Sequence, residues 1–454
     1  MHPRPLLLAA ALLTAGLGFA APAARALPPG YDLQLVHDSV DFPVGLRFAP
    51  DGRLFFLELF TGRVMTYPTG TSPAASVWAS IPISVDDERG LLGIAFHPDF
   101  PDSPFVYFYH TTPDSPRVNR VVRMTDSAGV GTRYTVLLDS LPGEGPRHHG
   151  GRLAFGPDRN LYVTTGEQGI HPEWSRDPSK PMGKILRLDL VGVPVPTNPY
   201  GSTNPAYAMG IRNSFGLCFD PLGGEGYFTD NGPDCDDELN HLVQAGDYGW
   251  GYDDLCGSQP PGTLLAMASF TPTIAPTGCC IYRGGVYAGM NGNLFFGAFN
   301  DGVIRRVVFH PGDPSVADTV ESFSQVLFES VMDITTGPDG RLWFSTASRI
   351  YRILEPGAAT SVPRAEGTGG WSVWPNPFVG AVTFAGPPAV AVRAFEIVDL
   401  AGRSVRRWRD ATAGERRWDG RDDAGREIPA GVYFIRARTS AGSRVLRVVK
   451  LSRP

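Results

Sequence analysis

The chain has 454 residues, so either two domains or one large repeat architecture with an appendage is expected. Hydrophobic residues make up 42%, charged residues only 19%, and the 54 Gly and 42 Pro residues suit many short strands joined by turns. The formal net charge of -6 argues against a nucleic-acid partner, because neutralising phosphates requires a concentrated excess of Lys and Arg.

Residues 1–26 have the features of a secretory signal peptide. His2 and Arg4 precede an apolar run from Leu6 to Ala20, and small residues follow up to Ala26. We expect cleavage after Ala26 and export to the periplasm, the cell surface or the extracellular space. No later stretch reaches the roughly 18 to 20 consecutive apolar residues that span a bilayer, so no transmembrane segment is expected in the mature chain.

Residues 30–355 contain six copies of one pattern, in which an apolar strand, a turn rich in Asp, Gly and Pro, and an aromatic-rich strand follow one another. The copies are GLRFAPDGRLFFLEL from Gly45, GIAFHPDFPDSPFVYFYH from Gly93, RLAFGPDRNLYVTTGE from Arg152, GLCFDPLGGEGYFTDNG from Gly216, YRGGVYAGMNGNLFFGAF from Tyr282 and DITTGPDGRLWFSTAS from Asp333. Six hairpins spaced by about 50 to 65 residues predict an all-β, six-bladed β-propeller. A two-sheet sandwich is the alternative.

The five cysteines are Cys218, Cys235, Cys256, Cys279 and Cys280. They suit an oxidising compartment, and their odd number leaves at least one without a disulfide partner in the chain. The sequence does not say which of them pair. A metal-thiolate site is disfavoured because the chain has no C-x-x-C pair.

After the last repeat, residues 356–370 are rich in Gly, Ala, Ser, Thr and Pro and indicate a linker. Residues 371–454 contain strands of alternating polarity and predict a small β-sandwich. The segments WPNPF (374–378) and WDGRDDAGREIPAGVYFIRA (418–437) resemble the Ig-like modules of flagellar hook-capping proteins and of C-terminal type IX secretion sorting domains. That resemblance implies secretion or attachment to the cell surface; a purely structural appendage is the alternative.

Five segments of the predicted propeller, taken together, resemble the soluble quinoprotein glucose/sorbosone dehydrogenases. They are ERGLLGIAFHPDF (88–100), HHGGRLAFGPD (148–158), GKILRLD (183–189), GIRNSFGLCFDP (210–221) and NGPDCDDELNHLVQAGDYGWG (231–251). The resemblance implies an oxidoreductase that oxidises the C1 hydroxyl of an aldose-type sugar. Hydride would pass to pyrroloquinoline quinone (PQQ), a cofactor held by Ca²⁺, and then electrons to an external acceptor.

His148 is the candidate catalytic base. It precedes a Gly-Gly pair at the start of a strand, and an imidazole titrates near neutral pH. The resemblance implies that it takes the hydroxyl proton while hydride leaves for the quinone. His149 is the neighbouring candidate, and strand alternation would point the two rings to opposite sides.

Arg212 and Asn213 are candidate cofactor-binding residues at the end of a loop. An Arg offers a planar, permanently charged fork to a carboxylate or carbonyl group. The resemblance implies that Arg212 polarises the quinone carbonyl that accepts hydride, which stabilises the developing oxyanion. An Arg that bridges two blades is the structural alternative.

The segment from Gly232 to Glu238 is a candidate calcium site, since carboxylates and the backbone carbonyls of a Gly-Pro turn suit a hard cation. By resemblance, the carbonyls of Gly232 and Pro233 hold the cofactor's Ca²⁺, and Glu238 and Tyr248 help to form a second calcium site. An acidic surface loop is the alternative.

The sequence departs from the family where the cofactor would bind. PQQ carries three carboxylates that need cationic partners once they are desolvated. Asn300 stands where the family has Lys, and Ser330 and Met332 stand where it has Arg. Three other positions also differ in charge or size from the family pattern: Glu88, Glu167 and Phe215.

Two further functions are therefore considered. One is a propeller without cofactor that acts as a surface binding module, resembling the hedgehog-interacting branch of the superfamily. The other is a calcium-dependent lactonase or another hydrolase, because Ca²⁺ and carboxylates at a propeller mouth can activate water. Positive charge at the mouth of the channel distinguishes the quinoprotein from the binding module.

Overall fold

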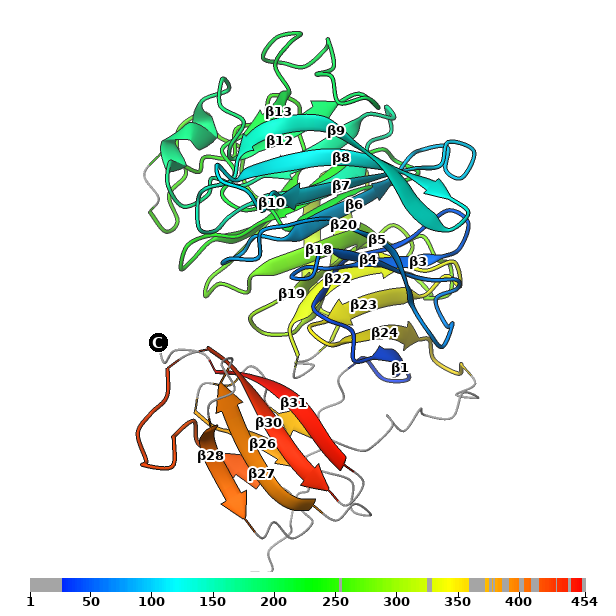
Figure 1. Ribbon diagram of the computed structural model, residues 1–454. Coiled ribbons are helices and arrows are strands. Elements are labelled where there is room, and N and C mark those ends of the chain that lie inside the picture. Colours follow the sequence, from blue (N-terminus) through cyan, green and yellow to red (C-terminus); the bar gives the residue numbers. More distant parts are fainter. Residues whose placement is uncertain are drawn as a thin grey trace, which may run out of the picture.

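The protein is built almost entirely of β-strands (Figure 1). The computed structural model describes residues 27–252, 255–324, 329–358, 372–374, 378, 380–385, 392–399, 404–409, 416–429, 431–439 and 442–450. The expected signal peptide at 1–26 and all but the first three residues of the expected linker lie outside the described residues.

Six four-stranded antiparallel sheets, named blades 1 to 6, follow one another along the chain. Blade 1 consists of β2 (Pro43–Phe48), β3 (Leu54–Glu58), β4 (Arg63–Tyr67) and β5 (Ser76–Ser80). Blade 2 consists of β6 (Leu91–Phe96), β7 (Phe105–Thr111), β8 (Val118–Ser127) and β9 (Val130–Pro142). Blade 3 consists of β10 (Gly150–Phe155), β11 (Leu161–Thr165), β12 (Lys184–Leu188) and β13 (Ala206–Met209). Blade 4 consists of β14 (Gly216–Phe219), β15 (Gly226–Asp230), β16 (Asp237–His241) and β17 (Ala268–Phe270). Blade 5 consists of β18 (Pro276–Ile281), β19 (Leu294–Ala298), β20 (Ile304–His310) and β21 (Asp313–Ser322). Blade 6 consists of β22 (Val331–Thr336), β23 (Leu342–Thr346), β24 (Arg349–Leu354) and β1 (Asp32–Asp38), and a short 3₁₀ helix, η1 (Pro172–Arg176), lies in blade 3 between β11 and β12.

The blades close into a ring. The first strand of each blade contacts the first strands of both neighbouring blades, and β22 contacts β2. The N-terminal strand β1 completes blade 6 by pairing antiparallel with β24, from Asp32 opposite Leu354 to Asp38 opposite Arg349 (Figure 1). This arrangement confirms the predicted all-β propeller, and its six sheets match the six repeats in the sequence.

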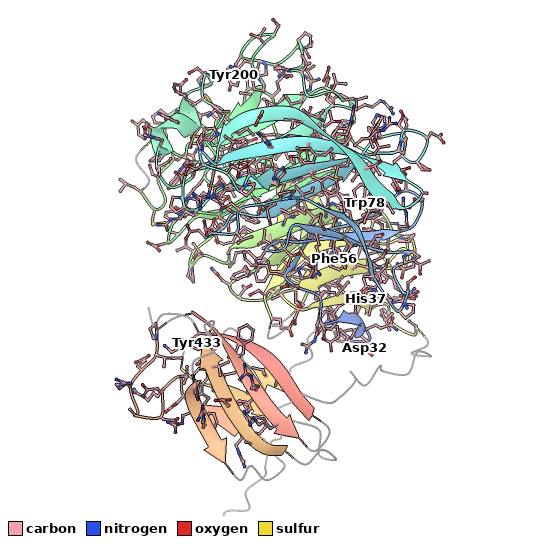
Figure 2. The ribbon with its side chains drawn as sticks, viewed as in Figure 1. Asp32, His37, Phe56, Trp78, Tyr200 and Tyr433 are labelled. Atoms are coloured by element: carbon pink, nitrogen blue, oxygen red, sulfur yellow. A yellow bond between two sulfur atoms is a disulfide. The ribbon has the colours of Figure 1, made fainter. Side chains whose placement is uncertain are left out.

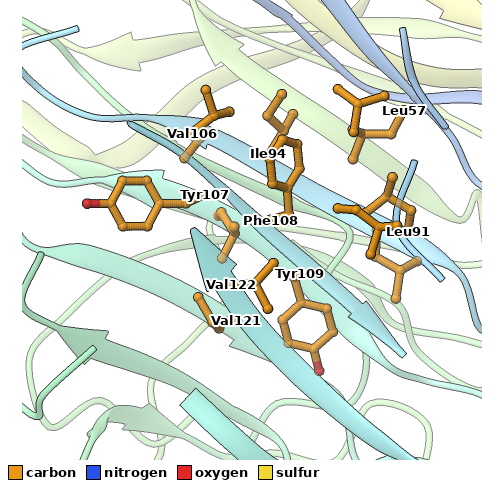
Figure 3. Close-up of a cluster of buried hydrophobic side chains, with 14 of the residues drawn as sticks. Leu57, Leu91, Ile94, Val106, Tyr107, Phe108, Tyr109, Val121 and Val122 are labelled. Atoms are coloured by element: carbon orange, nitrogen blue, oxygen red, sulfur yellow. The ribbon is translucent and has the colours of Figure 1, made fainter. Parts of the chain in front are cut away.

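Apolar side chains fill the space between adjacent blades. Between blades 1 and 2, Leu57 and Leu91 pack with buried side chains of β7 such as Phe108, which is labelled in Figure 3. Tyr109, on the other face of β7, lies against blade 3. Strands of this kind, buried on both faces, have nearly continuous apolar sequences instead of strict alternation. Burying each such side chain contributes roughly 1.5–3 kcal/mol to the free energy of unfolding. The contacts between blades therefore stabilise the ring.

A buried ion cluster joins three of the inner strands. Asp333 on β22 is fully buried and accepts hydrogen bonds from Arg47 on β2, at 3.3 Å, and from Arg152 on β10, at 3.1 Å. A side chain at Gly278 would collide with it, since a Cβ there would lie 1.7 Å from Asp333 Oδ1. The cluster thus joins blades 1, 3 and 6 across the channel.

The described residues from 372 to 450 form a second unit of two sheets. One contains β25 (Ser372–Trp374), β26 (Val382–Ala385) and β29 (Arg416–Trp418); the other contains β28 (Ser404–Arg409), β27 (Val392–Asp399), β30 (Gly431–Thr439) and β31 (Gly442–Lys450). Side chains from both sheets, among them Phe384, Trp418 and Ile435, share one buried core, and Tyr433 of this core is labelled in Figure 2. Two sheets packed on a common core form a β-sandwich.

Among the described residues, no helix is long and apolar enough to cross a membrane.

Candidate functional site

The predicted site residues gather at one rim of the ring. In each blade the first strand runs antiparallel to the second, so the start of the first strand lies beside the end of the second. In blade 3, for example, Gly150 at the start of β10 lies opposite Thr165 at the end of β11. His148 comes just before β10 and Glu167 just after β11. Arg212 occupies the equivalent place before β14 in blade 4. The topology therefore brings residues that are distant in sequence to one end of the inner strands.

His148 is held from two sides by carboxylates. Its Nδ1 is hydrogen-bonded to Oε1 of Glu167, and its backbone N–H donates to Oε2 of Glu88 at 2.7 Å. The residue has φ of 60° in the turn before β10, and its side chain is 8% exposed. An Nδ1–H that donates to Glu167 would leave the lone pair of the neutral ring on Nε2.

His149 has different partners and a different environment. Its Nδ1 lies 3.2 Å from Nδ2 of Asn119, and its carbonyl accepts the hydroxyl of Tyr109 at 3.1 Å. The residue is fully buried, and burial together with the nearby Arg89 lowers the pKa of its imidazole to about 3. His149 is therefore a neutral part of the packing between blades 2 and 3.

Arg212 lies next to Glu167 at the junction of blades 3 and 4. Its carbonyl accepts the N–H of Glu167 at 2.9 Å, and its Nη1 donates to the carbonyl of Asn231 at 2.8 Å. Its guanidinium lies 5.2 Å from the ring centroid of Trp250. Burial lowers its pKa, while the carboxylates of Asp230, Glu167, Glu88 and Asp237 act in the opposite direction. The charges that act most strongly on this guanidinium are thus negative.

Asp230 fixes the loop that carries Arg212 and Asn213. It accepts hydrogen bonds from the backbone N–H groups of Arg212, at 2.9 Å, and Asn213, at 2.6 Å. The Asn213 side chain in turn accepts the N–H of Gly150 at 3.2 Å, which ties blade 4 to the loop of His148. Burial raises the pKa of Asp230 to about 7. Arg212 and Asn213 are therefore rigidly positioned by a buried carboxyl group.

The loop that starts at Gly232 is held by internal bonds. Asp237 accepts the N–H of Gly232 at 2.8 Å and those of Ile274 and Ala275 at 2.6 Å each, so its oxygens serve the loop itself. A disulfide joins Cys235 to Cys256 and pins the loop to the following segment. Pro233 lies beside Gly232 in this turn. The loop is thus a fixed turn in which the side chain of Asp237 is already used by backbone N–H groups.

Glu238 and Asp230 form a pair of opposed carboxyl groups on neighbouring strands. They stand directly opposite each other in the pairing of β15 with β16, which places their side chains on the same face. Burial, together with the nearby carboxylates, raises the pKa of Glu238 to about 8. Tyr248 is the other residue predicted for this site, but its hydroxyl donates to the carbonyl of His241 at 2.6 Å and accepts the N–H of Val243 at 3.0 Å. Tyr248 would therefore bind a cation through its backbone.

The three positions that lack the family's cations contribute no charge. Asn300 donates to the carbonyl of Thr273 at 3.1 Å, Ser330 is buried, and Met332 packs into the apolar core of blades 1 and 2. Phe215, another departure, lies against the guanidinium of Arg152 and also packs on that core.

Sequence reasoning treated Glu167 only as a departure from the family and did not single out Asp230. The structure makes Glu167 the partner of His148 and Asp230 the anchor of Arg212. A signal for both was present, because each is a carboxylate at the end of the second strand of a blade, next to the start of the first.

Comparison with known proteins places these features in a family. The family model for glucose/sorbosone dehydrogenases matches residues 40–354, so the chain belongs to this family. The chain is 27% identical over 418 residues to quinoprotein glucose dehydrogenase B of Acinetobacter calcoaceticus, covering 71% of this chain and 86% of that protein.

Two solved structures are similar to the propeller. A putative oxidoreductase (glucose dehydrogenase) of Thermus thermophilus has 31% identity and a TM-score of 0.64, covering 72% of this chain and 100% of that one. The PQQ-bound aldose sugar dehydrogenase of Streptomyces coelicolor has 26% identity and a TM-score of 0.62, covering 72% of this chain and 99% of that one. The chain is thus a sugar-dehydrogenase propeller with a further C-terminal β-sandwich.

Proposed function

We propose that this protein is an exported oxidoreductase that oxidises the C1 hydroxyl of an aldose-type sugar with Ca²⁺-bound PQQ as the hydride acceptor. One observation carries the proposal: Glu167 holds the base through its carboxylate, which bonds to His148, and ties it to the residue that bears the cation through its backbone N–H, which donates to the backbone carbonyl of Arg212. Similarity to a PQQ-bound aldose sugar dehydrogenase supports the choice of cofactor.

The residues present fit one end of this cofactor. Arg212 and Asn213 would hold the quinone carbonyl, and the carbonyls of Gly232 and Pro233 in the fixed turn would hold the metal ion. The opposed carboxyl groups of Asp230 and Glu238 favour a divalent cation close by, because it would relieve the repulsion between them. The other end has fewer ionic partners than in the family, since Asn300, Ser330 and Met332 are uncharged. We therefore expect the cofactor to bind, with lower affinity than a full set of cations would give.

The protein's own residues then have separate tasks. Nε2 of His148 takes the proton of the substrate hydroxyl, and Glu167 stabilises the imidazolium that forms. When bound, PQQ would supply the acceptor for the hydride, which carries both electrons of the oxidation. Arg212 places its positive charge where negative charge develops on that acceptor, within a largely buried site where the interaction is strong.

A turnover assay tests the proposal. The purified full-length chain would be supplied with Ca²⁺ and PQQ, and dye reduction would be followed with a panel of aldoses. We expect turnover that requires both additions. Dye reduction that is absent with every aldose, although the chain is folded and loaded with Ca²⁺, would reject the proposed oxidoreductase.

Glu167→Gln tests the positioning of the base. Gln keeps the size and a hydrogen-bond acceptor but removes the charge that stabilises the imidazolium, so kcat should fall at least about tenfold with little change in KM. Glu167→Asp keeps the charge and should recover part of the loss. An unchanged kcat in Glu167→Gln would mean that the carboxylate has only a structural role.

The calcium site predicts a pH-dependent stabilisation. Because burial raises the pKa of Asp230 to about 7 and of Glu238 to about 8, these groups are protonated in the folded metal-free chain at pH 5, whereas the unfolded chain has released their protons. Without Ca²⁺ their contribution to stability is thus present at low pH and lost as pH rises to about 8. Added Ca²⁺ should raise the melting temperature more at pH 8 than at pH 5, because its ligands must be deprotonated.

Melting curves at both pH values, with Ca²⁺ and with chelator, measure this difference. Glu238→Gln should reduce the gain at pH 8. An equal effect of Ca²⁺ on wild type and Glu238→Gln would place the ion elsewhere.

A surface binding module without cofactor is the second candidate. The lack of charge at Asn300, Ser330 and Met332 and the four carboxylates that influence Arg212 favour it. In that case Ca²⁺ would stabilise the chain while PQQ would not bind. The C-terminal sandwich would serve either candidate as an Ig-like sorting or surface-attachment module.

A further inference from the structure

Two cysteine side chains from neighbouring blades meet inside the ring. Cys218 lies on β14 of blade 4, Cys279 lies on β18 of blade 5, and their Sγ atoms are 3.0 Å apart. Both residues are buried, with exposures of 9% and 1%. They are 61 residues apart in the chain, so a bond between them would join the inner strands of two blades.

The two thiols line a cavity on the axis of the propeller. The cavity has a volume of about 320 Å³, and it is bounded by at least one residue from each inner strand: Arg47, Ile94, Leu153, Cys218, Cys279 and Thr335. The ion cluster of Asp333 borders this cavity through Arg47, and its other two members, Arg152 and Asp333, precede the cavity residues of β10 and β22. The thiol pair is therefore separate from the candidate site at the rim.

The geometry favours a bond between the sulfurs over a shared metal ion. Two thiolates on a tetrahedral Zn²⁺, with Zn–S bonds of about 2.3 Å, lie about 3.8 Å apart. The observed 3.0 Å is shorter than that spacing; both residues are thiols in the structure, and their sulfurs would have to close by about 1 Å to reach the disulfide bond length of about 2.05 Å. Blade 4, which contains Cys218, already has the Cys235–Cys256 disulfide. Disulfides form and persist in oxidising compartments, so a second one is compatible with the first.

We propose that Cys218 and Cys279 form a second disulfide, which links blades 4 and 5 in the wall of the central channel. Of five cysteines, two form the Cys235–Cys256 bond and two would form this one, which leaves Cys280 as the single thiol. The proposal rests on the proposed export and not on the proposed catalysis.

The bond forms by exchange with a small disulfide such as oxidised glutathione, or with the disulfide of an exported thiol oxidase. One cysteine thiolate attacks the small disulfide, which gives a mixed disulfide and releases one thiol. The second thiolate then attacks the cysteine sulfur of the mixed disulfide, which closes the protein bond and releases the second thiol. The two cysteines lose two electrons and two protons, and the small disulfide takes them up as two thiols. Burial raises the pKa of Cys218, so exchange should occur while the chain folds.

Thiol counting tests the proposal. The full chain is secreted into an oxidising compartment or refolded with a glutathione redox pair, denatured without reductant, and labelled with a maleimide. We expect one label in the wild type, none in Cys280→Ala, and two each in Cys218→Ala and Cys279→Ala. A peptide that links residues 218 and 279 should appear in a digest made without reductant.

Three labels in the folded wild type, with Cys235–Cys256 intact, would overturn the proposal, and so would a bond that contains Cys280. If Cys218→Ala or Cys279→Ala fails to fold, the wild type and Cys280→Ala still decide the outcome. The readout needs no sugar, metal or cofactor, so failure of the proposed dehydrogenase activity leaves this test unaffected.

Discussion

Replacing His148 with Asn should lower kcat for aldose oxidation by about 10²- to 10⁴-fold, the range attributed to a positioned general base. Asn is chosen because it tolerates the left-handed backbone at this position, where φ is 60°. The amide cannot accept a proton at neutral pH, whereas the hydrogen bond from the backbone N–H to Glu88 can persist. Steady-state dye reduction in the presence of Ca²⁺ and PQQ measures the loss.

A matched change distinguishes loss of the base from damage to the fold. His310 is exposed on blade 5 and bonded to Asp318, so His310→Asn should keep the activity of the wild type. Both variants should melt close to the wild type. If His148→Asn turns over at the wild-type rate, the assignment of the base is wrong.

Replacing Asp333 with Asn should destabilise the propeller by about 3–5 kcal/mol, the cost of removing one partner from a buried ion pair. Asn retains the shape, but Arg152, with a side chain only 3% exposed, would keep a buried charge without its carboxylate. The melting temperature should fall by on the order of 10 °C, measured by calorimetry. Asp318→Asn, at an exposed ion pair, should change stability by less than about 0.5 kcal/mol.

A variant that removes every charge of the same cluster provides the comparison. Removing all three charges together, with Arg47→Met, Arg152→Met and Asp333→Leu, should recover most of the stability, because no buried charge is then left unpaired. If Asp333→Asn melts like the wild type, the cluster does not hold the inner strands together.

Much of the fold could be predicted because its pattern is local. Each repeat contains two strands and the turn between them, and such a hairpin is visible in about 20 residues of sequence. The closure of blade 6 by β1 was not predicted, because Asp32 and Leu354 lie at opposite ends of the propeller sequence and no local pattern connects them. The Asp333 cluster was missed for the same reason, since its partners come from blades 1 and 3.

The candidate site could be predicted only in part. His148, Arg212 and the Gly232 turn were found through motifs that resemble a family, and the structure gathers His148 and Arg212 at one rim. Their supporting carboxylates, Glu167 and Asp230, were not identified as partners, because hydrogen bonds between blades depend on how neighbouring inner strands align. The sequence also left the cysteine pairing open, because which cysteines meet depends on how the strands and loops of the blades are placed in space.

Titration of the Ca²⁺-loaded chain with PQQ, followed by quenching of tryptophan fluorescence, tests the central claim most directly, because Trp250 lies against Arg212. We expect saturable binding with a Kd in the micromolar range that is lost with chelator and weakened at least about tenfold in Arg212→Met, which corresponds to about 1.4 kcal/mol. Absence of saturation at PQQ concentrations on the order of 100 µM, in a chain that Ca²⁺ stabilises, would contradict the quinoprotein.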